Sequence, residues 1–294
     1  LRRIRQNGNK SGGDEMKHIY LNLKRFDIPA EYGGVNRTGD LADWGRGIVE
    51  DTQKELERYS GEAEFVMFFP EAHLLGAVRA RRSDSPVKLG CQSVYREDTA
   101  EGGNFGAFTC ARPAAAAKAL GCEYTLIGHC EERRDKEGIL KEAGVKAPDA
   151  VNRILNAQIK AAQARGLRVL YCVGETQEER GRWREILEKQ LVEGLDGADR
   201  NLIVVAYEPV WSIGPGRKPA ERSDIEKAAQ FIKERTDGLD VVYGGGLKKE
   251  NAAMLAHISS IDGGLIALTR FEGEIGFYSE EYLEIVRLYL KGLR

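Results

Sequence analysis

The sequence predicts an α/β protein that folds as a single domain, a closed barrel of eight parallel strands alternating with helices. Eight short apolar runs rich in β-branched residues recur along the 294 residues, and longer amphipathic stretches lie between them. No long linker or change of composition divides the chain. Barrels of this kind commonly form one domain of about 200–250 residues, so the length agrees with the pattern.

The apolar runs predict strands that are buried on both faces, because apolar residues follow one another with little alternation. The expected strands cover residues 18–23, 64–69, 87–92, 124–128, 168–173, 202–207, 240–243 and 264–268. The expected helices cover residues 41–59, 114–120, 150–165, 178–195, 224–235, 252–257 and 280–290. Two helices begin with the capping-box pattern, Thr176 with Glu179 and Ser223 with Glu226, which predicts where they start.

The first 15 residues are polar and rich in glycine, and Met16 follows them as a plausible internal start. We therefore expect residues 1–15 to be a disordered leader and residues 16–294 to form the barrel domain. No apolar stretch approaches the length of a membrane span, and the N-terminus lacks the apolar region of a signal peptide. The sequence thus predicts a soluble cytoplasmic protein that does not act at a membrane.

The formal net charge of −2 gives no general affinity for nucleic acid or anionic lipid, so the expected partners are small molecules or a second copy of the chain. The five cysteines include no C-x-x-C pair, and their odd number suits a reducing compartment better than a disulfide framework. We expect them to be buried and inert thiols.

Glu208 is the strongest candidate for a reacting group. It directly follows the apolar run 202–207, and the carboxyl ends of parallel barrel strands carry the chemistry of such folds. The loop that follows, 209–216, begins with Pro209 and contains Gly214 and Gly216 near its end, as a hinged lid would. The other interpretation of this segment taken alone is a solvated glutamate before a tight turn.

Polar residues also follow other predicted strands. His129 comes directly after the fourth, where a helix beginning at the next residue would keep its ring neutral; a structural histidine is the alternative. Asn22 and Lys24 follow the first and would place a donor and a charge over the barrel mouth, although such a lysine is often only solvated. The glycines 244–246 suit the approach of an anion or simply form a turn.

Several other reaction classes find no support in the sequence. The chain has no H-E-x-x-H motif, no Walker loop, no G-x-S-x-G elbow and no G-x-G-x-x-G after a strand. We therefore expect neither zinc-protease, nucleotide nor serine-hydrolase chemistry, and no cofactor or metal.

Taken together, the segments at the strand ends resemble triosephosphate isomerase, in the same chain order and from about residue 17 to the C-terminus. The segments are Asn22-Leu23-Lys24, Gly106-Ala107-Phe108-Thr109, Ile127-Gly128-His129-Cys130-Glu131, Cys172-Val173-Gly174-Glu175, Ala206-Tyr207-Glu208-Pro209-Val210-Trp211-Ser212-Ile213-Gly214 and Tyr243-Gly244-Gly245. The resemblance implies a TIM barrel and an aldose-ketose isomerase of glycolysis and gluconeogenesis that needs no cofactor.

The resemblance also implies roles for individual residues. Glu208 would move a proton between two neighbouring substrate carbons, and a neutral His129 would donate to the enediolate oxygens. Lys24 would hold its ammonium near the developing charge, with support from Asn22. Glu131 and Cys172 would lie behind the reacting groups. The backbone amide of Gly214 would reach the phosphate when the lid closes.

The phosphate end departs from the family pattern. Ala267 and Leu268 stand where the family usually has two glycines whose amides bind phosphate, and Gly246 stands where serine is usual. Leu268 adds bulk and resists a positive φ. We expect Arg270 to compensate as a direct phosphate ligand.

The leading hypothesis is the interconversion of dihydroxyacetone phosphate and D-glyceraldehyde 3-phosphate by enediolate proton transfer. The replaced glycines leave open an isomerase of a related sugar phosphate, such as a four-carbon erythrulose phosphate. A non-catalytic paralogue that binds a sugar phosphate is the alternative of another class. By resemblance, the loop containing Thr109 would join two subunits into a homodimer, although residues 101–104 lengthen it here.

Overall fold

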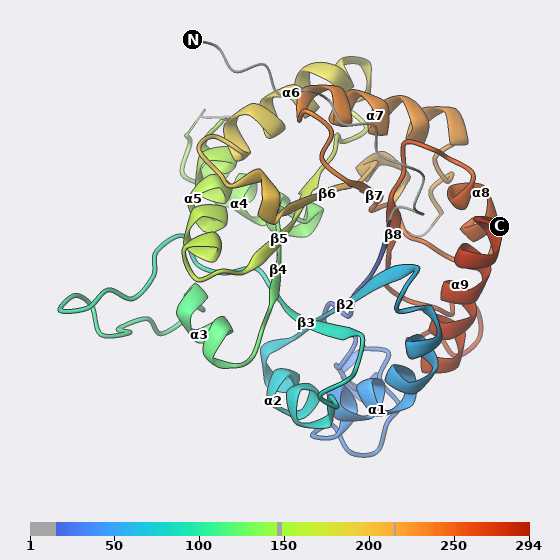
Figure 1. Cartoon of the computed structure of the whole chain (residues 1–294). Helices are drawn as coiled ribbons and strands as arrows, with labels where there is room; N and C mark the ends of the chain where they lie inside the picture. The colour runs from blue at the N-terminus through green and yellow to red at the C-terminus, as the bar shows by residue number, and fades with distance from the viewer. Residues whose placement is uncertain (1–15, 146–148, 215) are drawn as a thin grey trace, which may run out of the picture.

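The computed structural model describes residues 16–145, 149–214 and 216–294, so the expected leader lies outside the described residues. Eight parallel strands close a barrel in chain order, and the last strand pairs with the first (Figure 1). The strands are β1 (Lys17–Asn22), β2 (Ala63–Phe69), β3 (Val87–Gln92), β4 (Tyr124–Ile127), β5 (Arg168–Val173), β6 (Ile203–Tyr207), β7 (Val241–Tyr243) and β8 (Gly263–Ile266). The predicted fold class is confirmed.

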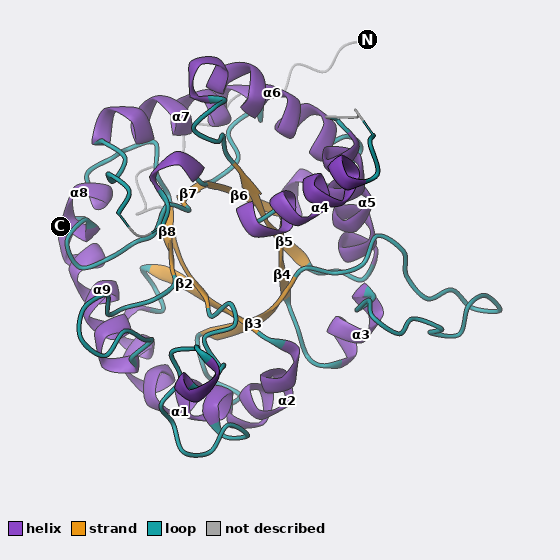
Figure 2. Cartoon of the chain, turned by 180° about the vertical axis from the view of Figure 1, so that it is seen from behind, coloured by secondary structure: helices purple, strands orange, loops and turns teal. Residues whose placement is uncertain are grey.

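Helices surround the strands as an outer ring (Figure 2). They are α1 (Trp44–Leu56), α2 (Glu71–Ala80), α3 (Ala114–Ala119), α4 (Cys130–Glu142), α5 (Ala150–Ala164), α6 (Trp183–Gly194), α7 (Arg222–Arg235), α8 (Ala252–Ala256) and α9 (Ser279–Gly292). Short 3-10 turns are η1 (Ala30–Tyr32), η2 (Glu57–Tyr59), η3 (Arg180–Arg182), η4 (Arg200–Leu202) and η5 (Val210–Ser212).

The strands bury both faces because each face meets a different core. Alternate side chains fill the barrel interior, such as Tyr20 on β1 and Val204 and Ala206 on β6. Their neighbours pack outward against the helices. Continuing the same alternation turns Asn22 and Glu208 toward the mouth of the barrel, at the carboxyl ends of their strands.

Both predicted capping boxes were wrong as helix starts. Glu179 Oε2 does accept a hydrogen bond from the Thr176 amide at 2.9 Å, but this closes a turn that leads into η3. Gly181 lies in that 3-10 turn, and α6 begins only at Trp183. In α7 the helix starts at Arg222, so Ser223 lies inside the first turn and caps nothing.

The expectation that all five thiols are buried was also wrong. Cys110 is exposed and Cys130 is half-buried, while the other three are buried. Cys110 belongs to the long connection between β3 and α3, which extends away from the barrel in Figure 1.

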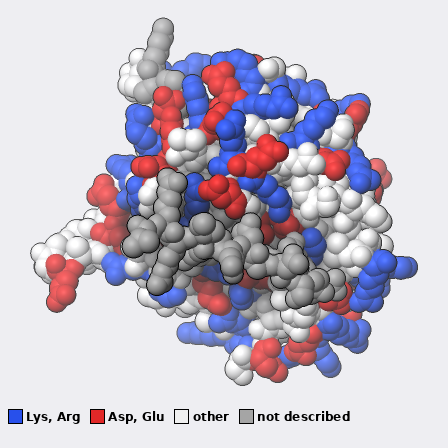
Figure 3. All heavy atoms as spheres, turned by 45° about the horizontal axis from the view of Figure 1, so that its top comes forward, with Lys and Arg blue, Asp and Glu red and all other residues white. Residues whose placement is uncertain are grey.

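The surface carries both signs of charge, which are interspersed over the face seen in Figure 3. Within the described ranges, no helix combines the length and the apolar composition that crossing a bilayer requires.

A network of charges closes the amino ends of the strands, opposite the expected site. His18 contacts Glu64 through Nδ1 and Asp240 through Nε2, both at 3.0 Å. Burial alone would raise the pKa of Glu64, but hydrogen bonds from His18, Lys88 and Tyr124 hold that pKa well below its usual range. Burial alone would lower the pKa of His18, but its two carboxylate partners raise it.

This network makes stability depend on pH. A raised pKa in the folded state means that His18 stabilises the fold below its unfolded pKa, and that this contribution is lost as pH rises through the folded pKa. We expect the difference in unfolding free energy between the wild type and His18→Gln to shrink between about pH 6 and about pH 8.5. Urea unfolding at both values measures it.

Candidate active site

Glu208 sits where two neighbouring strands approach closely. A side-chain carbon at Gly174, after β5, would lie 1.8 Å from the Glu208 carbonyl oxygen, and one at Gly244, after β7, would lie 2.7 Å from Glu208 Cγ. Neither position tolerates a side chain, so both glycines are required for the strand ends to close around Glu208. Gly174 and Gly244 thus leave the space that the Glu208 side chain occupies.

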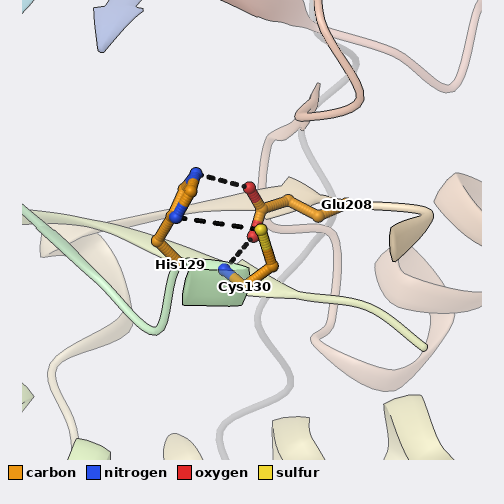
Figure 4. A group of neighbouring side chains, drawn as sticks. All are labelled: His129, Cys130 and Glu208. Carbon is orange, nitrogen blue, oxygen red and sulfur yellow. Dashed lines mark hydrogen bonds and ion pairs between the residues drawn. The ribbon is translucent and has the colours of Figure 1, made fainter. Parts of the chain in front are cut away.

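Glu208 is 2 % exposed, and only one of its two carboxylate oxygens accepts a hydrogen bond. Oε2 accepts a hydrogen bond from the Cys130 amide at 2.9 Å. Oε1 lies 3.2 Å from His129 Nε2, yet it has no hydrogen-bond partner of acceptable geometry among the described residues (Figure 4). A buried carboxylate oxygen with no donor is costly to maintain, and it is available to accept a proton from another molecule.

His129 is the N-cap residue of α4, so a helix does begin at the next residue, although α4 was not among the predicted helices. Its Nδ1 accepts a hydrogen bond from the Glu131 amide at 3.3 Å. In a neutral ring the proton therefore sits on Nε2, the nitrogen that faces Glu208.

Lys24 is held in a strained backbone conformation with φ of 42°, which is uncommon for any residue other than glycine. Its amide donates to Asn22 Oδ1 at 3.1 Å, and its carbonyl accepts from Gln92 Nε2 at 2.9 Å. Its ammonium lies 3.2 Å from Glu131 Oε1. Gln92 was not predicted as a site residue, because its contact with Lys24 depends on the strand pairing.

A cavity of about 400 Å³ opens at the mouth of the barrel. Its lining residues are Asn22, Lys24, Arg25, Phe26, Gln92, Ser93, Leu126, His129, Glu131 and Glu132. The structure therefore brings together four of the predicted site residues around one space. Glu208 does not line this cavity but contacts His129, which does.

The two residues expected behind the reacting groups lie on different sides of them. Burial alone would raise the pKa of Glu131, but the charge of Lys24 outweighs it and lowers that pKa, so the carboxylate stays ionised beside the ammonium. Cys172 is buried inside the barrel on β5. Burial and the charge of Glu208 raise the pKa of the Cys172 thiol well above its usual value.

Arg133 supports the turn that carries His129, and sequence patterns did not single it out. Its guanidinium is buried and donates to the carbonyl oxygens of Gly128 at 2.9 Å and Cys172 at 3.0 Å. It also donates to Asn152 Oδ1 at 2.9 Å and to the Tyr171 hydroxyl at 3.0 Å. The side chain thereby fixes the end of β4 to β5.

The predicted lid begins with η5 and is latched to the barrel. Trp211 Nε1 donates to Glu175 Oε1 at 2.7 Å, and the Tyr207 hydroxyl donates to the same oxygen at 3.0 Å. Burial raises the pKa of Glu175. Gly214 is exposed on the loop with φ of 113°, so its amide is not at the cavity in this conformation.

The expected phosphate ligands are not gathered around the cavity. Gly246 follows β7 with φ of 101°, and Ala267 and Leu268 follow β8, where they are half-buried and have no positive φ. Arg270 Nε donates to Glu281 Oε1 at 2.9 Å, and its guanidinium stacks 3.7 Å from the Tyr278 ring. The guanidinium is therefore engaged by α9, and a role as phosphate ligand would require it to leave Glu281.

Lys248 is a cation at this end that the sequence analysis did not single out. Its ammonium lies 3.9 Å from the centroid of the Phe271 ring, in the loop after β8. Burial lowers the pKa of this ammonium. A side-chain carbon at Gly246 would meet Lys248 Cε at 3.4 Å, so the lysine stem runs along the glycine turn. No sequence motif marks such a lysine, because its position depends on the fold of two loops.

The comparisons with known proteins agree with this geometry. The family model described as triosephosphate isomerase matches residues 43–285. A triosephosphate isomerase of Dehalococcoides mccartyi is 30% identical over 251 residues, which cover 82% of this chain and 88% of the relative. One of Pelodictyon phaeoclathratiforme is 39% identical over 196 residues, or 63% of this chain and 70% of the relative.

Among solved structures, triosephosphate isomerase from Bartonella henselae superposes with a TM-score of 0.70 at 25% identity, covering 93% of this chain and 98% of that one. The resemblance first drawn from the strand ends thus extends over the barrel as a whole. This chain belongs to the triosephosphate isomerase family.

Proposed function

We propose that this chain interconverts dihydroxyacetone phosphate and D-glyceraldehyde 3-phosphate by moving a proton between neighbouring carbons. The observation that carries the proposal is the buried Glu208 Oε1, which has no hydrogen-bond donor among the described residues and lies 3.2 Å from His129 Nε2. A base and an electrophile at matched strand ends have no use in a protein that only binds.

The reaction would move protons both at carbon and at oxygen. Glu208 takes a proton from the carbon next to the substrate carbonyl, which leaves an enediolate, and returns it to the neighbouring carbon. The neutral His129 donates from Nε2 to the enediolate oxygens and carries protons between them. The Lys24 ammonium stabilises the negative charge, and its strained backbone is fixed by Asn22 and Gln92.

The carbon acid is weak, so donors placed in advance must stabilise the enediolate. One such donor is typically worth about 2.7–4 kcal/mol. Lid closure would exclude water and strengthen these interactions. It requires that the Trp211 hydrogen bond to Glu175 opens, because η5 is anchored there. Closure would also carry the Gly214 amide toward the substrate phosphate.

The residues that replace the family's usual phosphate ligands are the reason to test a second substrate, a four-carbon sugar phosphate. Leu268 replaces a glycine, Arg270 is engaged by Glu281, and Lys248 supplies a half-buried cation near Gly246. In this proposal the phosphate is bound by the amides of Gly246, Ala267 and Leu268. A related four-carbon sugar phosphate would have to be bound by the same loops.

A coupled assay of the purified protein with glyceraldehyde 3-phosphate, run beside four-carbon ketose phosphates, tests the proposal. Fast turnover of the triose supports it. Turnover of only the longer substrate would assign the isomerase chemistry to that substrate, and the replaced residues after β8 would then be the specificity determinants. Binding of phosphate compounds without turnover of any substrate would favour a binding protein.

We also propose a homodimer formed through the loop of Thr109. This loop extends from the barrel between β3 and α3 (Figure 1). Phe105 on it is 86% exposed. Arg165 on α5 donates to the Thr99 carbonyl at 2.5 Å and forms an ion pair with Asp98, which fixes the base of the loop. The exposed Phe105 on a loop with a fixed base supports the proposal.

Replacing Phe105 with serine is expected to shift the chain from dimer to monomer, because the loop would lose its main apolar contact. Sedimentation velocity over a dilution series measures the shift. Ile139→Ser is the matched control, since Ile139 is 62% exposed on α4 and should leave the dimer intact. A wild-type chain that sediments as a monomer would contradict the proposal.

A further inference from the structure

Three side chains of different chemical type converge at the end of β4 and β6 (Figure 4). His129, Cys130 and Glu208 each offer one potential metal-ligand atom, and these three atoms lie within 4.8 Å of one another. Two of the residues are buried and the thiol is half-buried. The proposed isomerase reaction uses His129 and Glu208, but it gives the Cys130 thiol no role.

The donor set suits a borderline-soft divalent cation. Imidazole, thiolate and carboxylate are the ligands that Zn²⁺ takes in proteins, whereas Mg²⁺ and Ca²⁺ prefer oxygen alone. In a tetrahedral zinc site, bond lengths of about 2.0–2.3 Å place neighbouring ligand atoms about 3.3–3.6 Å apart. His129 Nε2 and Glu208 Oε1 are already 3.2 Å apart. Cys130 Sγ lies 3.8 Å from Nδ1, the other nitrogen of the ring, so the thiol must turn toward Nε2 to complete the set.

We propose that these three residues form an inhibitory site for Zn²⁺ in the active site itself. Three protein ligands leave one position open for water, the arrangement of an accessible zinc site. The bound ion would occupy the lone pairs of both the base and the electrophile. The enzyme would therefore be catalytically inactive while the ion is bound.

The proton balance is simple. The Cys130 thiol loses its proton to water when sulfur binds the ion. His129 shifts its ring proton from Nε2 to Nδ1, so that Nε2 can bind the ion, and the hydrogen bond that Nδ1 accepts from the Glu131 amide is broken. Glu131 Oε2 lies 3.6 Å from Nδ1 and can accept the hydrogen bond of the new tautomer, as carboxylates behind metal-bound histidines do.

Cys130 is the residue that distinguishes this site from a plain histidine and glutamate pair. Its backbone amide, not its side chain, donates to Glu208 Oε2. Cys130→Ser therefore removes the soft ligand and keeps that hydrogen bond. Cys110→Ser is the matched control, because Cys110 is the exposed thiol on the long loop, outside the site.

The test uses the full chain freed of any purification tag. Titration with Co²⁺, followed by the near-ultraviolet charge-transfer band of a cobalt–thiolate bond, reports sulfur ligation, and competition with Zn²⁺ gives the zinc affinity. We expect one ion per chain. Loss of even an outer-shell partner costs about 10- to 100-fold in metal affinity, so Cys130→Ser should weaken binding at least that much and abolish the band. Cys110→Ser should behave as the wild type.

Inhibition is measured separately, as the fraction of each variant's own zinc-free rate. The wild type should lose its activity at the zinc concentration that fills the site. The proposal is overturned if Cys130→Ser binds Zn²⁺ as tightly as the wild type, if the band depends on Cys110, or if no ion binds. The absorption readout does not depend on turnover, so it decides the metal site even where the proposed reaction fails.

Discussion

Replacing Glu208 with glutamine is expected to lower kcat by about 100- to 10,000-fold, the usual contribution of a general base. Glutamine keeps the size of the side chain, and its carbonyl oxygen can still accept the Cys130 amide that now binds Oε2. Its amide group cannot accept a proton from carbon. Binding of phosphate compounds should persist, because Glu208 takes no part in holding the phosphate.

Glu175→Gln is the matched control for this variant. Glu175 and Glu208 are both 2% exposed, follow neighbouring strands and each have one buried oxygen without a hydrogen-bond partner, but Glu175 Oε1 accepts hydrogen bonds from both Trp211 and Tyr207. Its loss should disturb the latch of the lid and cost far less turnover than the loss of Glu208. Steady-state kinetics of both variants decide the point. Comparable losses would mean that Glu208 is one buried carboxylate among others rather than the base.

The barrel could be predicted from the sequence because its signal is local. Each strand is a short apolar run, and the structure shifts the predicted ends by two residues at most. The predicted starts of α6 and α7 failed for a different reason. The bond between the Thr176 amide and Glu179 is real, but a single local hydrogen bond can close either a helix or an isolated turn, and packing decides which.

The residues proposed to react could be located from the sequence because each lies within two residues of the end of a strand. Glu208, His129 and Lys24 need only the rule that strand ends of a parallel barrel meet at one face. Arg270 shows where that rule stops. Its role as a phosphate ligand stays a prediction, but its partner Glu281 lies on α9, and no local pattern shows that contact.

Arg133 is the largest structural contribution that sequence patterns did not reveal. Two consecutive arginines on a helix predict a solvated face. In the structure Arg134 is exposed, but Arg133 is only 7% exposed. The difference arises because only Arg133 faces the β4 and β5 strand ends. There it satisfies the carbonyl oxygens of Gly128 and Cys172.

Replacing Arg133 with methionine is therefore expected to destabilise the fold by about 3 kcal/mol or more. Methionine fills part of the space but leaves three buried acceptors without a donor, each of which costs about 1–3 kcal/mol. These acceptors are Gly128 O, Cys172 O and Asn152 Oδ1. Urea unfolding of the wild type and the variant measures the loss.

The variant should also lower kcat more than it changes KM, because Gly128 immediately precedes His129 and the freed turn no longer holds the imidazole against Glu208. Arg134→Met is the control, and as a surface change it should stay within about 0.5 kcal/mol of the wild type. Equal destabilisation by both variants would show that helix charge, rather than the buried contacts, is responsible. A stable Arg133→Met protein with normal kcat would mean that the strand ends alone position His129.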